Sequence, residues 1–476
     1  MRPRYFLWAG TLLLVAAGCQ KAGRYVPPSG REEEDAPRAA ALPPLSAGLQ
    51  WQDPDPTLLS PIIRIEFVHA GTAPAAWAKL TKTWTIPAPS PTRAAAALAG
   101  GPLGAAAVAV SPTAAAIQIK VPLGLDDPTA FIPADNPPTL AKWELGRRLF
   151  FDNAWLEAKP GTSCVSCHSP ERGYTDHLAA HPDGFNAPSL VNCVYNRRQF
   201  WDGRAALLEE VVQRTLEDER PADKPARFHH VWGGVIGRLR ADRSYRIEFR
   251  EAFGTEPTQD ALGRAVATYL RTVLSGNSLH DRAAQARAKR GAGGPEEKDY
   301  EAVLDDAALE GLGRKGGKKA DVAAQLWRGH ELFHGKGRCA VCHGGNQFSD
   351  GRFHNLGVGD ELAHTARVGR FTTVPLGEKT RYLIGAWKTP TLRGLRRSAP
   401  YFHDGSQNNL AEVVRFHAAG GRASLFLSPL MRDRDGRPND LGLTADEVDA
   451  LALFLLALNG EEVDPFVQGP PPPVRR

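Results

Sequence analysis

Two five-residue stretches, Cys164-Val-Ser-Cys167-His168 and Cys339-Ala-Val-Cys342-His343, decide how this chain folds. Each has the form C-x-x-C-H, the attachment signature of c-type haem. Two thiols at this spacing reach the two vinyl groups of one porphyrin, and the adjacent imidazole ligates its iron. A pair of redox or zinc C-x-x-C sites is the alternative, but a histidine follows both pairs. The sequence therefore predicts two covalently attached haems c, with His168 and His343 as proximal ligands.

The other two of the 6 cysteines are Cys19 and Cys193. Cys19 follows a basic start and a short apolar run, a pattern typical of a signal peptide. Small residues directly before Cys19 resemble a bacterial lipobox, so we expect residues 1–19 to be a signal peptide and Cys19 to be lipidated. An ordinary signal peptidase site is the alternative. Cys193 then has no disulfide partner and is expected to be buried.

The composition of the chain changes along its length. The 476 residues carry a net charge of +5 and no basic tract with interleaved aromatic residues, so we expect no nucleic-acid partner. Residues 20–50 are rich in proline, alanine and charge and are expected to form a flexible linker. Residues 51–120 hold two stretches of strand character, 62–68 and 115–121. We expect a small, partly β N-terminal extension of unknown role there, and a Pro-rich tail at 466–476.

From residue 121 onward the sequence pattern is helical. Thr139 is the expected N-cap of one helix. Apolar residues at helical spacing predict a second helix over about 258–274. Thr444-x-x-Glu447 is a capping box that opens a third. The sequence therefore predicts a mainly α protein.

The two halves of this helical part repeat each other. Three pairs of stretches match at one separation, 390 − 188 = 202 residues. They are Pro188-Ser-Leu190 with Pro390-Thr-Leu392, Phe200-Trp-Asp-Gly203 with Phe402-His-Asp-Gly405, and Leu208-x-Glu-Val-Val212 with Leu410-x-Glu-Val-Val414. Chance similarity would not hold one register over that length. We therefore expect two cytochrome c-like haem domains in tandem, 121–320 and 321–465.

One position differs between the two copies in a way that affects the chemistry. A haem iron needs a sixth ligand to be a pure electron carrier, and an open or labile sixth site to react with a small oxidant. His417 follows the second Val-Val pair, and its counterpart in the first copy (417 − 202) is Thr215, whose hydroxyl is a poor iron ligand. The sequence predicts a closed second haem, with His343 and His417, and an available first haem at His168.

Six further stretches are more specific than the repeat alone. They are Leu145-Gly-Arg-Arg-Leu-Phe-Phe151, Asn186-Ala-Pro-Ser-Leu190, Phe200-Trp-Asp-Gly-Arg204, Phe353-His-Asn-Leu-Gly357, Lys388-Thr-Pro-Thr-Leu-Arg393 and Pro400-Tyr-Phe-His-Asp-Gly405. With these, residues 121–462 resemble the bacterial di-haem cytochrome c peroxidase and MauG family. His354 and His403 lie in these stretches and are expected to hydrogen-bond haem propionates or backbone.

The resemblance implies a division of roles between the haems. Peroxide would react at the first, low-potential haem, and electrons would enter at the second, high-potential one. Trp201 matches a tryptophan that lies between the haems in that family. A calcium ion between the domains would bind Asn186 and backbone carbonyls near Ser398 and Pro400.

The axial ligands depart from the family pattern. Members of the family place Met or Tyr where this chain has His417. A histidine in place of methionine should lower the potential of the second haem. Met431, the weaker candidate, lies outside the matching helix. On the first haem the family carries a displaceable histidine, for which His177 and His181 are available in the loop after the first motif, and we favour His181 as ligand.

The groups expected to act on peroxide also differ from the family pattern. The distal Gln and Glu of the family align with Val211 and Pro221. Gln213, Glu217 and Glu219 lie on the same segment, and we select Gln213 and Glu219 as the catalytic candidates. An ordinary solvated helix end is the alternative. Acid–base help of this kind contributes about 10²–10⁴-fold to a rate.

Three functions remain in view. The leading hypothesis is a peroxidase that reduces hydrogen peroxide to water at the first haem, with electrons relayed through Trp201 from the second haem. The second is a MauG-like oxidase that stores two oxidising equivalents across both haems and oxidises a protein or organic substrate. The third is a non-catalytic di-haem electron-transfer lipoprotein.

Location and partners follow from the same features. Haem c is attached outside the cytoplasm, so we expect a periplasmic protein held to the outer membrane by a lipid anchor. The expected electron donor is a small cytochrome c or a cupredoxin. A homodimer is an open alternative to a monomer.

Overall fold

The computed structural model describes residues 65–69, 117–156, 163–176, 185–216, 232–359 and 368–470. All of them belong to one compact unit, Pro54–Arg476. Several predictions concern residues outside these ranges: the signal peptide with Cys19, the linker at 20–50, most of 51–120, the end of the tail, and His177, His181, Glu217 and Glu219.

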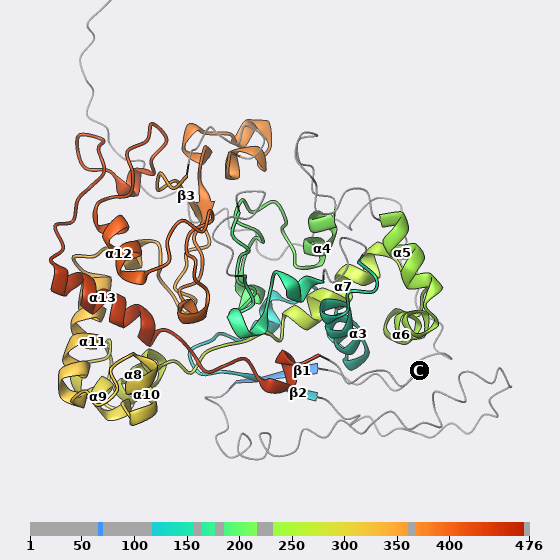
Figure 1. The fold of residues 1–476 in the computed structure, drawn as a ribbon, viewed down its shortest axis with the longest axis horizontal. Coiled ribbons are helices and arrows are strands. Elements are labelled where there is room, and N and C mark those ends of the chain that lie inside the picture. The colour runs from blue at the N-terminus through green and yellow to red at the C-terminus, as the bar shows by residue number, and fades with distance from the viewer. Residues whose placement is uncertain are drawn as a thin grey trace, which may run out of the picture. The chain divides into compact units, whose positions relative to one another are not determined.

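The described residues are mainly helical, which confirms the predicted mainly α character (Figure 1). The helices are α3 (Leu140–Phe151), α4 (Glu209–Leu216), α5 (Trp232–Ala241), α6 (Arg243–Phe253), α7 (Gln259–Leu270), α8 (Leu279–Ala288), α9 (Glu297–Val303), α10 (Asp306–Gly311), α11 (Lys319–His334), α12 (Leu410–Ala418), α13 (Ala445–Ala457) and α14 (Pro465–Gln468). No helix among the described residues is both long and apolar enough to cross a membrane.

Four short strands among the described residues form two separate pairs. β1 (Ile65–His69) runs parallel to β2 (Ile117–Val121), with Ile65 opposite Ile117. Both lie close to the stretches whose strand character the sequence predicts. β3 (Phe353–His354) pairs antiparallel with β4 (Trp387–Lys388).

The predicted helix starts are confirmed by their caps. The hydroxyl of Thr139 accepts a hydrogen bond from the amide of Lys142 at the start of α3. Thr444 and Glu447 exchange side-chain and backbone hydrogen bonds at the start of α13, as a capping box does. The helix predicted over about 258–274, α7, ends at Leu270. Its continuation bends, and the carbonyl of Val273 accepts from the amide of Asn192 instead.

Two glycines explain how each half packs its helices. A Cβ on Gly146 of α3 would lie 1.9 Å from the carbonyl oxygen of Ala265 in α7, and one on Gly329 of α11 would lie 2.2 Å from that of Ala450 in α13. Only glycine permits backbones to approach this closely. Both glycines begin a Gly-x-x-Leu-Phe stretch, at 146–150 and at 329–333. Each half therefore builds its main helix crossing in the same way.

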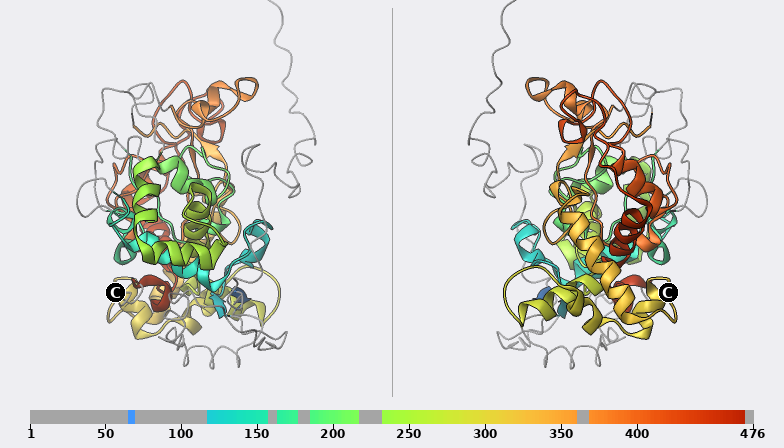
Figure 2. Two further views of the ribbon diagram at one scale, coloured as in Figure 1. Left: turned by 90° about the vertical axis from the view of Figure 1, so that its right-hand side faces the viewer. Right: turned by 90° about the vertical axis from the view of Figure 1, so that its left-hand side faces the viewer.

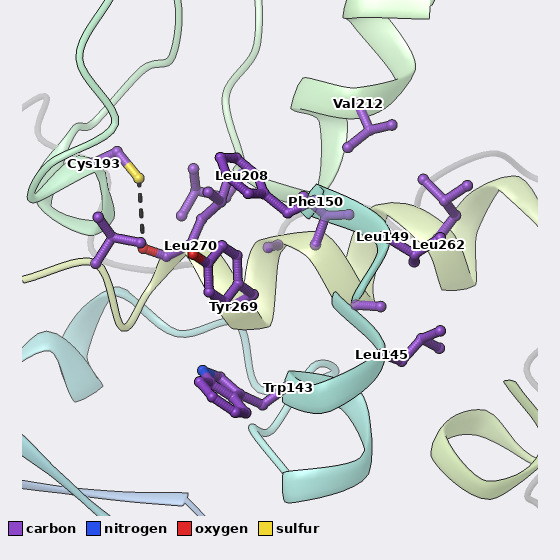
Figure 3. Close-up of a cluster of buried hydrophobic side chains, with 14 of the residues drawn as sticks. Trp143, Leu145, Leu149, Phe150, Cys193, Leu208, Val212, Leu262, Tyr269 and Leu270 are labelled. Carbon is purple, nitrogen blue, oxygen red and sulfur yellow. Dashed lines mark hydrogen bonds between the residues drawn. The ribbon is translucent and has the colours of Figure 1, made fainter. Parts of the chain in front are cut away.

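The described residues form two hydrophobic cores. The first contains Trp143, Leu149 and Phe150 of α3 against α7 (Figure 3), and it takes in Cys193, whose thiol is buried as predicted and lies 3.8 Å from the carbonyl of Leu270. The second core draws on α8 to α13. Figure 2 views the helices of each core from its own side of the molecule.

The division between the cores falls earlier than the predicted domain boundary. The first core reaches Leu274 and is joined by Val463 and Val467 near the C-terminus, whereas the second begins at Leu279. Helices α8 to α10, which precede residue 320, therefore pack with the second core. The predicted domain limits themselves stay predictions.

Candidate di-haem site

Each C-x-x-C-H motif forms the same short turn. Cys164–Ser166 is a single 3₁₀ turn, after which the amide of His168 donates to the carbonyl of Cys164 at 2.9 Å. Cys339–Val341 repeats this turn, and the amide of His343 donates to the carbonyl of Cys339 at 2.8 Å. The two cysteines and the histidine of each motif are thereby held in one tight loop.

Three of the histidines predicted to ligate iron lie within the described residues, and these three share one tautomer. Nδ1 of His168 lies 3.0 Å from the carbonyl oxygen of Tyr174, and Nδ1 of His343 lies 2.8 Å from that of Phe348. Nδ1 of His417 lies 2.8 Å from the carbonyl oxygen of Val413. A carbonyl can only accept, so each Nδ1 carries the proton and each Nε2 keeps the lone pair that a metal needs.

Burial favours the neutral form of two of these histidines. Burial, with a contribution from the nearby imidazole of His417, lowers the pKa of His343 to about 4. Burial also lowers the pKa of His417. Since only a neutral imidazole ligates a metal, both side chains are in the ligating form at neutral pH.

One cavity joins the two motifs. It is lined by His168 from the first half and by His343 and His417 from the second. About 2480 Å³ within it is free of protein atoms, including the part that opens to solvent. Met431 also lines the cavity. The residues present therefore fit two haems c, with one proximal histidine at each site.

Trp201 lies where the two halves meet. It lines the cavity, and its indole N–H donates to the carbonyl of Asn186 at 2.8 Å. The amide of Asn186 donates to the carbonyl of His403 at 2.7 Å, and the amide of Lys388 donates to the carbonyl of Trp201 at 2.8 Å. These bonds fix Trp201 to both halves of the cavity wall.

The side chain of Asn186 reaches the carbonyls of the other half. Its Nδ2 donates to the carbonyl of Pro400 at 2.6 Å and to that of Phe402 at 3.2 Å. Its Oδ1 is buried and accepts no hydrogen bond from any residue that the structure describes. The carbonyl of Pro400 was expected near Asn186, whereas the hydrogen bond to the carbonyl of Phe402 was not predicted.

The described residues of the first half bring no carboxylate to the cavity. Val211 and Thr215 of α4 line the cavity, but Gln213 is not among the lining residues. Residues four apart share one face of a helix, and Gln213 falls on another. None of the described residues that line the cavity is an aspartate or a glutamate. The structure therefore does not bring Gln213 to the site, and Glu219 lies outside the described ranges.

His354 is paired with a carboxylate, a contact that the sequence did not predict. Its Nε2 lies 2.8 Å from a carboxylate oxygen of Asp350. Although burial lowers it, the hydrogen bonds to Asp350 and Cys342 raise the pKa of His354 to about 9. Ligating atoms of these three residues lie within 4.8 Å of one another. This cluster would suit a metal ion if the C-x-x-C-H motif did not assign Cys342 to haem.

Sequence reasoning gave no role to two residues of the cavity wall, the half-buried Trp387 and the buried Lys388. Burial lowers the pKa of Lys388 to about 8, and its ammonium lies 3.4 Å from the amide oxygen of Asn196. Trp387 stacks on His403. The 202-residue repeat was the available signal, because it pairs these residues with Phe185 and Asn186.

A mainly helical fold with two C-x-x-C-H turns around one cavity defines a di-haem c-type cytochrome. Residues 140–289 match the sequence profile of the family described as di-haem cytochrome c peroxidase. Cytochrome-c peroxidase IdrP1 from Denitromonas iodatirespirans is 30% identical over 401 residues, which cover 76% of this chain and 92% of that protein. The chain belongs to the di-haem cytochrome c peroxidase and MauG family, as the sequence motifs indicated.

Two further proteins show the breadth of this similarity. Methylamine utilization protein MauG from Methylorubrum extorquens is 33% identical over 307 residues, or 62% of this chain and 74% of that protein. The solved structure of a MauG-like protein associated with microbial copper homeostasis superposes with a TM-score of 0.55 at 26% identity, covering 71% of this chain and 95% of that one. The protein is thus a peroxide-dependent oxidoreductase with two haems c, and a purely electron-carrying lipoprotein is not retained.

Proposed function

We propose that the protein reduces hydrogen peroxide to water at a first haem held by Cys164, Cys167 and His168. Electrons enter at a second haem, held by Cys339, Cys342 and His343. The observation that carries this proposal is the single cavity that joins His168 to His343 and His417. A carrier needs one exposed haem edge, whereas a shared cavity allows electrons gathered at one haem to be used at the other.

The haems supply the redox chemistry, and the chain holds them and selects what reaches them. The carbonyls of Tyr174 and Phe348 orient the proximal imidazoles through their Nδ1 protons. The backbone of Asn186 holds the indole of Trp201 in the cavity wall, where we place the electron path between the haems.

We assign His417 as the sixth ligand of the second haem. Its half-buried, neutral imidazole lines the cavity close to His343 and has Nε2 free for a metal. Met431 lines the same cavity and stays the weaker candidate. Two histidines give a lower potential than Met with His, so this haem would yield an electron more readily than its counterpart with methionine.

The acid–base group at the first haem is assigned to Glu219, with Gln213 as the second candidate and His181 as a displaceable ligand. A group of this kind moves a proton between the peroxide oxygens during O–O cleavage. Gln213 would need a change of register in α4 to reach the cavity, so Glu219 is the stronger of the two candidates.

We also propose a calcium ion beside Trp201. Calcium prefers oxygen ligands, and the buried amide of Asn186 lies against the carbonyl oxygens of Pro400 and Phe402. Exchanging Oδ1 and Nδ2 by a half-turn of the amide would bring three oxygens together and would use the buried Oδ1 that has no described partner.

The remaining assignments follow the sequence. We place the protein in the periplasm, anchored to the outer membrane through lipidated Cys19, with a small cytochrome c or cupredoxin as donor. Residues 121–320 and 321–465 would form the two haem domains. A homodimer stays a hypothesis.

The test is a peroxide titration of the purified holoprotein. With a reduced small cytochrome as donor, we expect two donor electrons to be consumed for each peroxide, and catalysis to need prior reduction of the second haem. A holoprotein with full haem content that oxidises no donor when peroxide is added would contradict the proposal.

A MauG-like oxidase is the second candidate, and two observations favour it. The described cavity lining holds no carboxylate, and His417 supplies a second imidazole. Peroxide added to the resting diferric protein separates the candidates. A long-lived near-infrared charge-resonance band supports the oxidase, and reactivity only after one-electron reduction supports the peroxidase.

A further inference from the structure

A second tryptophan lies in the wall of the di-haem cavity, in ring contact with a histidine. The rings of Trp387 and His403 are stacked, with centroids 4.2 Å apart and planes 22° apart. Phe185 meets Trp387 edge-on at 5.2 Å. Trp387 and His403 both line the cavity that holds the three ligand histidines and Trp201. Nothing in the proposed peroxidase cycle yet uses this pair.

The internal repeat relates this pair to Trp201. The separation of 202 residues that aligns the halves also aligns His403 with Trp201 (403 − 201) and Trp387 with Phe185 (387 − 185). The tryptophan therefore occupies different positions in the two halves. In the first half the indole stands at position 201, and in the second half it stands at the position of Phe185.

The backbone obeys the same symmetry. The amide of Asn186 donates to the carbonyl of His403 at 2.7 Å, and the equivalent amide of Lys388 donates to the carbonyl of Trp201 at 2.8 Å. The residues before the two exchanged positions, Phe200 and Phe402, share a left-handed backbone with φ of 66° and 68°. The two aromatic sites are thus built alike and are joined directly by hydrogen bonds.

Trp387 is held firmly in this position. It belongs to β4, where it is paired with His354 of β3, and the next residue, Lys388, bonds to the backbone of Trp201. Stacking on an aromatic ring stabilises this placement beyond simple burial. A fixed indole beside another ring, in the same cavity as both haem sites, is well placed to give up an electron.

We propose that Trp387 is a second redox-active tryptophan of the di-haem site, and this inference rests on the proposed peroxide chemistry. Hydrogen peroxide takes up two electrons and two protons to give two waters. One of the electrons comes from the haems and the other from the indole of Trp387, which keeps its N–H proton and becomes a cation radical, while both protons come from solvent. The stacked ring of His403 stabilises this radical until an electron from the donor restores the indole.

The experiment compares holoprotein variants after peroxide is added without a donor. Trp387→Phe removes the oxidisable ring, and Trp387→Tyr replaces it with another. The matched control is Trp327→Phe on α11, whose indole is 39% exposed and does not line the cavity. Haem content and the Soret band of every variant must match those of the wild type.

Two readouts report on the radical itself. Freeze-quench electron paramagnetic resonance should show a tryptophan radical in the wild type and in Trp327→Phe. The intensity of this tryptophan radical signal should fall at least twofold in Trp387→Phe, and a tyrosyl signal should replace it in Trp387→Tyr. Peptide mass spectrometry should find oxygen added to the wild-type peptide with Trp387 and not to the one with Trp327.

The outcomes separate this inference from the function on which it rests. An unchanged tryptophan signal in Trp387→Phe, with an unmodified Trp387 peptide in a wild type that consumes peroxide, overturns the inference alone. A fully loaded wild type that consumes no peroxide overturns the proposed function and the inference together.

Discussion

Thr215 and His417 stand at equivalent positions of the two halves, and each bonds to the carbonyl four residues earlier in its helix. The hydroxyl of Thr215 donates to Val211 at 2.8 Å, and Nδ1 of His417 donates to Val413 at 2.8 Å. Both side chains line the same cavity. After its bond is made, the imidazole still has Nε2 to offer, whereas the hydroxyl donor of threonine is used within its own helix. This difference underlies the unequal roles proposed for the haems.

Replacing the imidazole with a thioether should raise the potential of the second haem. We expect His417→Met to shift that potential upward by on the order of 100 mV, within the roughly 0.8 V that axial ligands span. A spectroelectrochemical titration that resolves the two haems measures the shift. Met431→Leu is the control and should leave both potentials unchanged. A shift in the Met431 variant alone would assign the ligand to Met431 instead.

Introducing a histidine into the first half tests the open site. Thr215→His gives α4 the residue that α12 has, so the first iron should become low-spin and its reaction with peroxide should slow at least tenfold. Stopped-flow spectra of the reduced protein measure this rate. Thr215→Val keeps the shape without a ligand and should react like the wild type. Equal rates in all three proteins would argue against this position facing the iron.

The helix crossing in the first core predicts a stability effect. Gly146→Ala would place a methyl group 1.9 Å from the carbonyl oxygen of Ala265, and overpacking of this kind costs about 1–3 kcal/mol. Gly237 of α5 is exposed with open space around it, so Gly237→Ala should instead stabilise by up to about 1 kcal/mol. Thermal unfolding followed by circular dichroism measures both changes, and a stable Gly146→Ala protein would contradict the packing.

A half-buried histidine that does not line the haem cavity, His280, predicts a pH dependence. Burial, assisted by His330, lowers the pKa of His280 to about 3 from its ordinary 6.5, and its Nδ1 bonds to the hydroxyl of Tyr300. Below pH 6.5 the unfolded chain binds the proton and the folded chain does not. Stability is therefore complete above pH 6.5 and is lost as the pH falls toward 3, by up to about 1.4 kcal/mol per pH unit.

The measurement is the melting temperature between pH 7 and 5. The wild type should lose more stability over this range than His280→Gln, which has no proton to gain there. Parallel curves for the two proteins would show that His280 does not cause the loss.

The sequence predicted the features that depend on local pattern or on the repeat. Thr139 and Thr444 cap their helices as expected because capping depends on residues only three apart. The contrast of Thr215 with His417 was visible because one offset aligns the halves. Trp387 stacking on His403, and Asp350 pairing with His354, were not predicted. In each case side-chain positions set by the folded chain, rather than a motif, decide the contact.

The departure of Gln213 from the cavity has a similar cause. Its polarity made it a candidate, but the helical phase of α4 gives the cavity face to Val211 and Thr215. The sequence did not predict that the second core begins before residue 320, because α8 to α10 carry no motif. Their assignment depends on which core their apolar faces meet.

The most direct test of unequal haems is a ligand titration of the resting diferric protein with azide or cyanide, followed by electron paramagnetic resonance. We predict that only one haem binds the added ligand, and that its signal is lost in the His168→Gly variant. The other should keep an unchanged bis-histidine low-spin signal, which disappears in His417→Ala. Two low-spin haems that both resist the ligand, or a second haem indifferent to the loss of His417, would contradict the account.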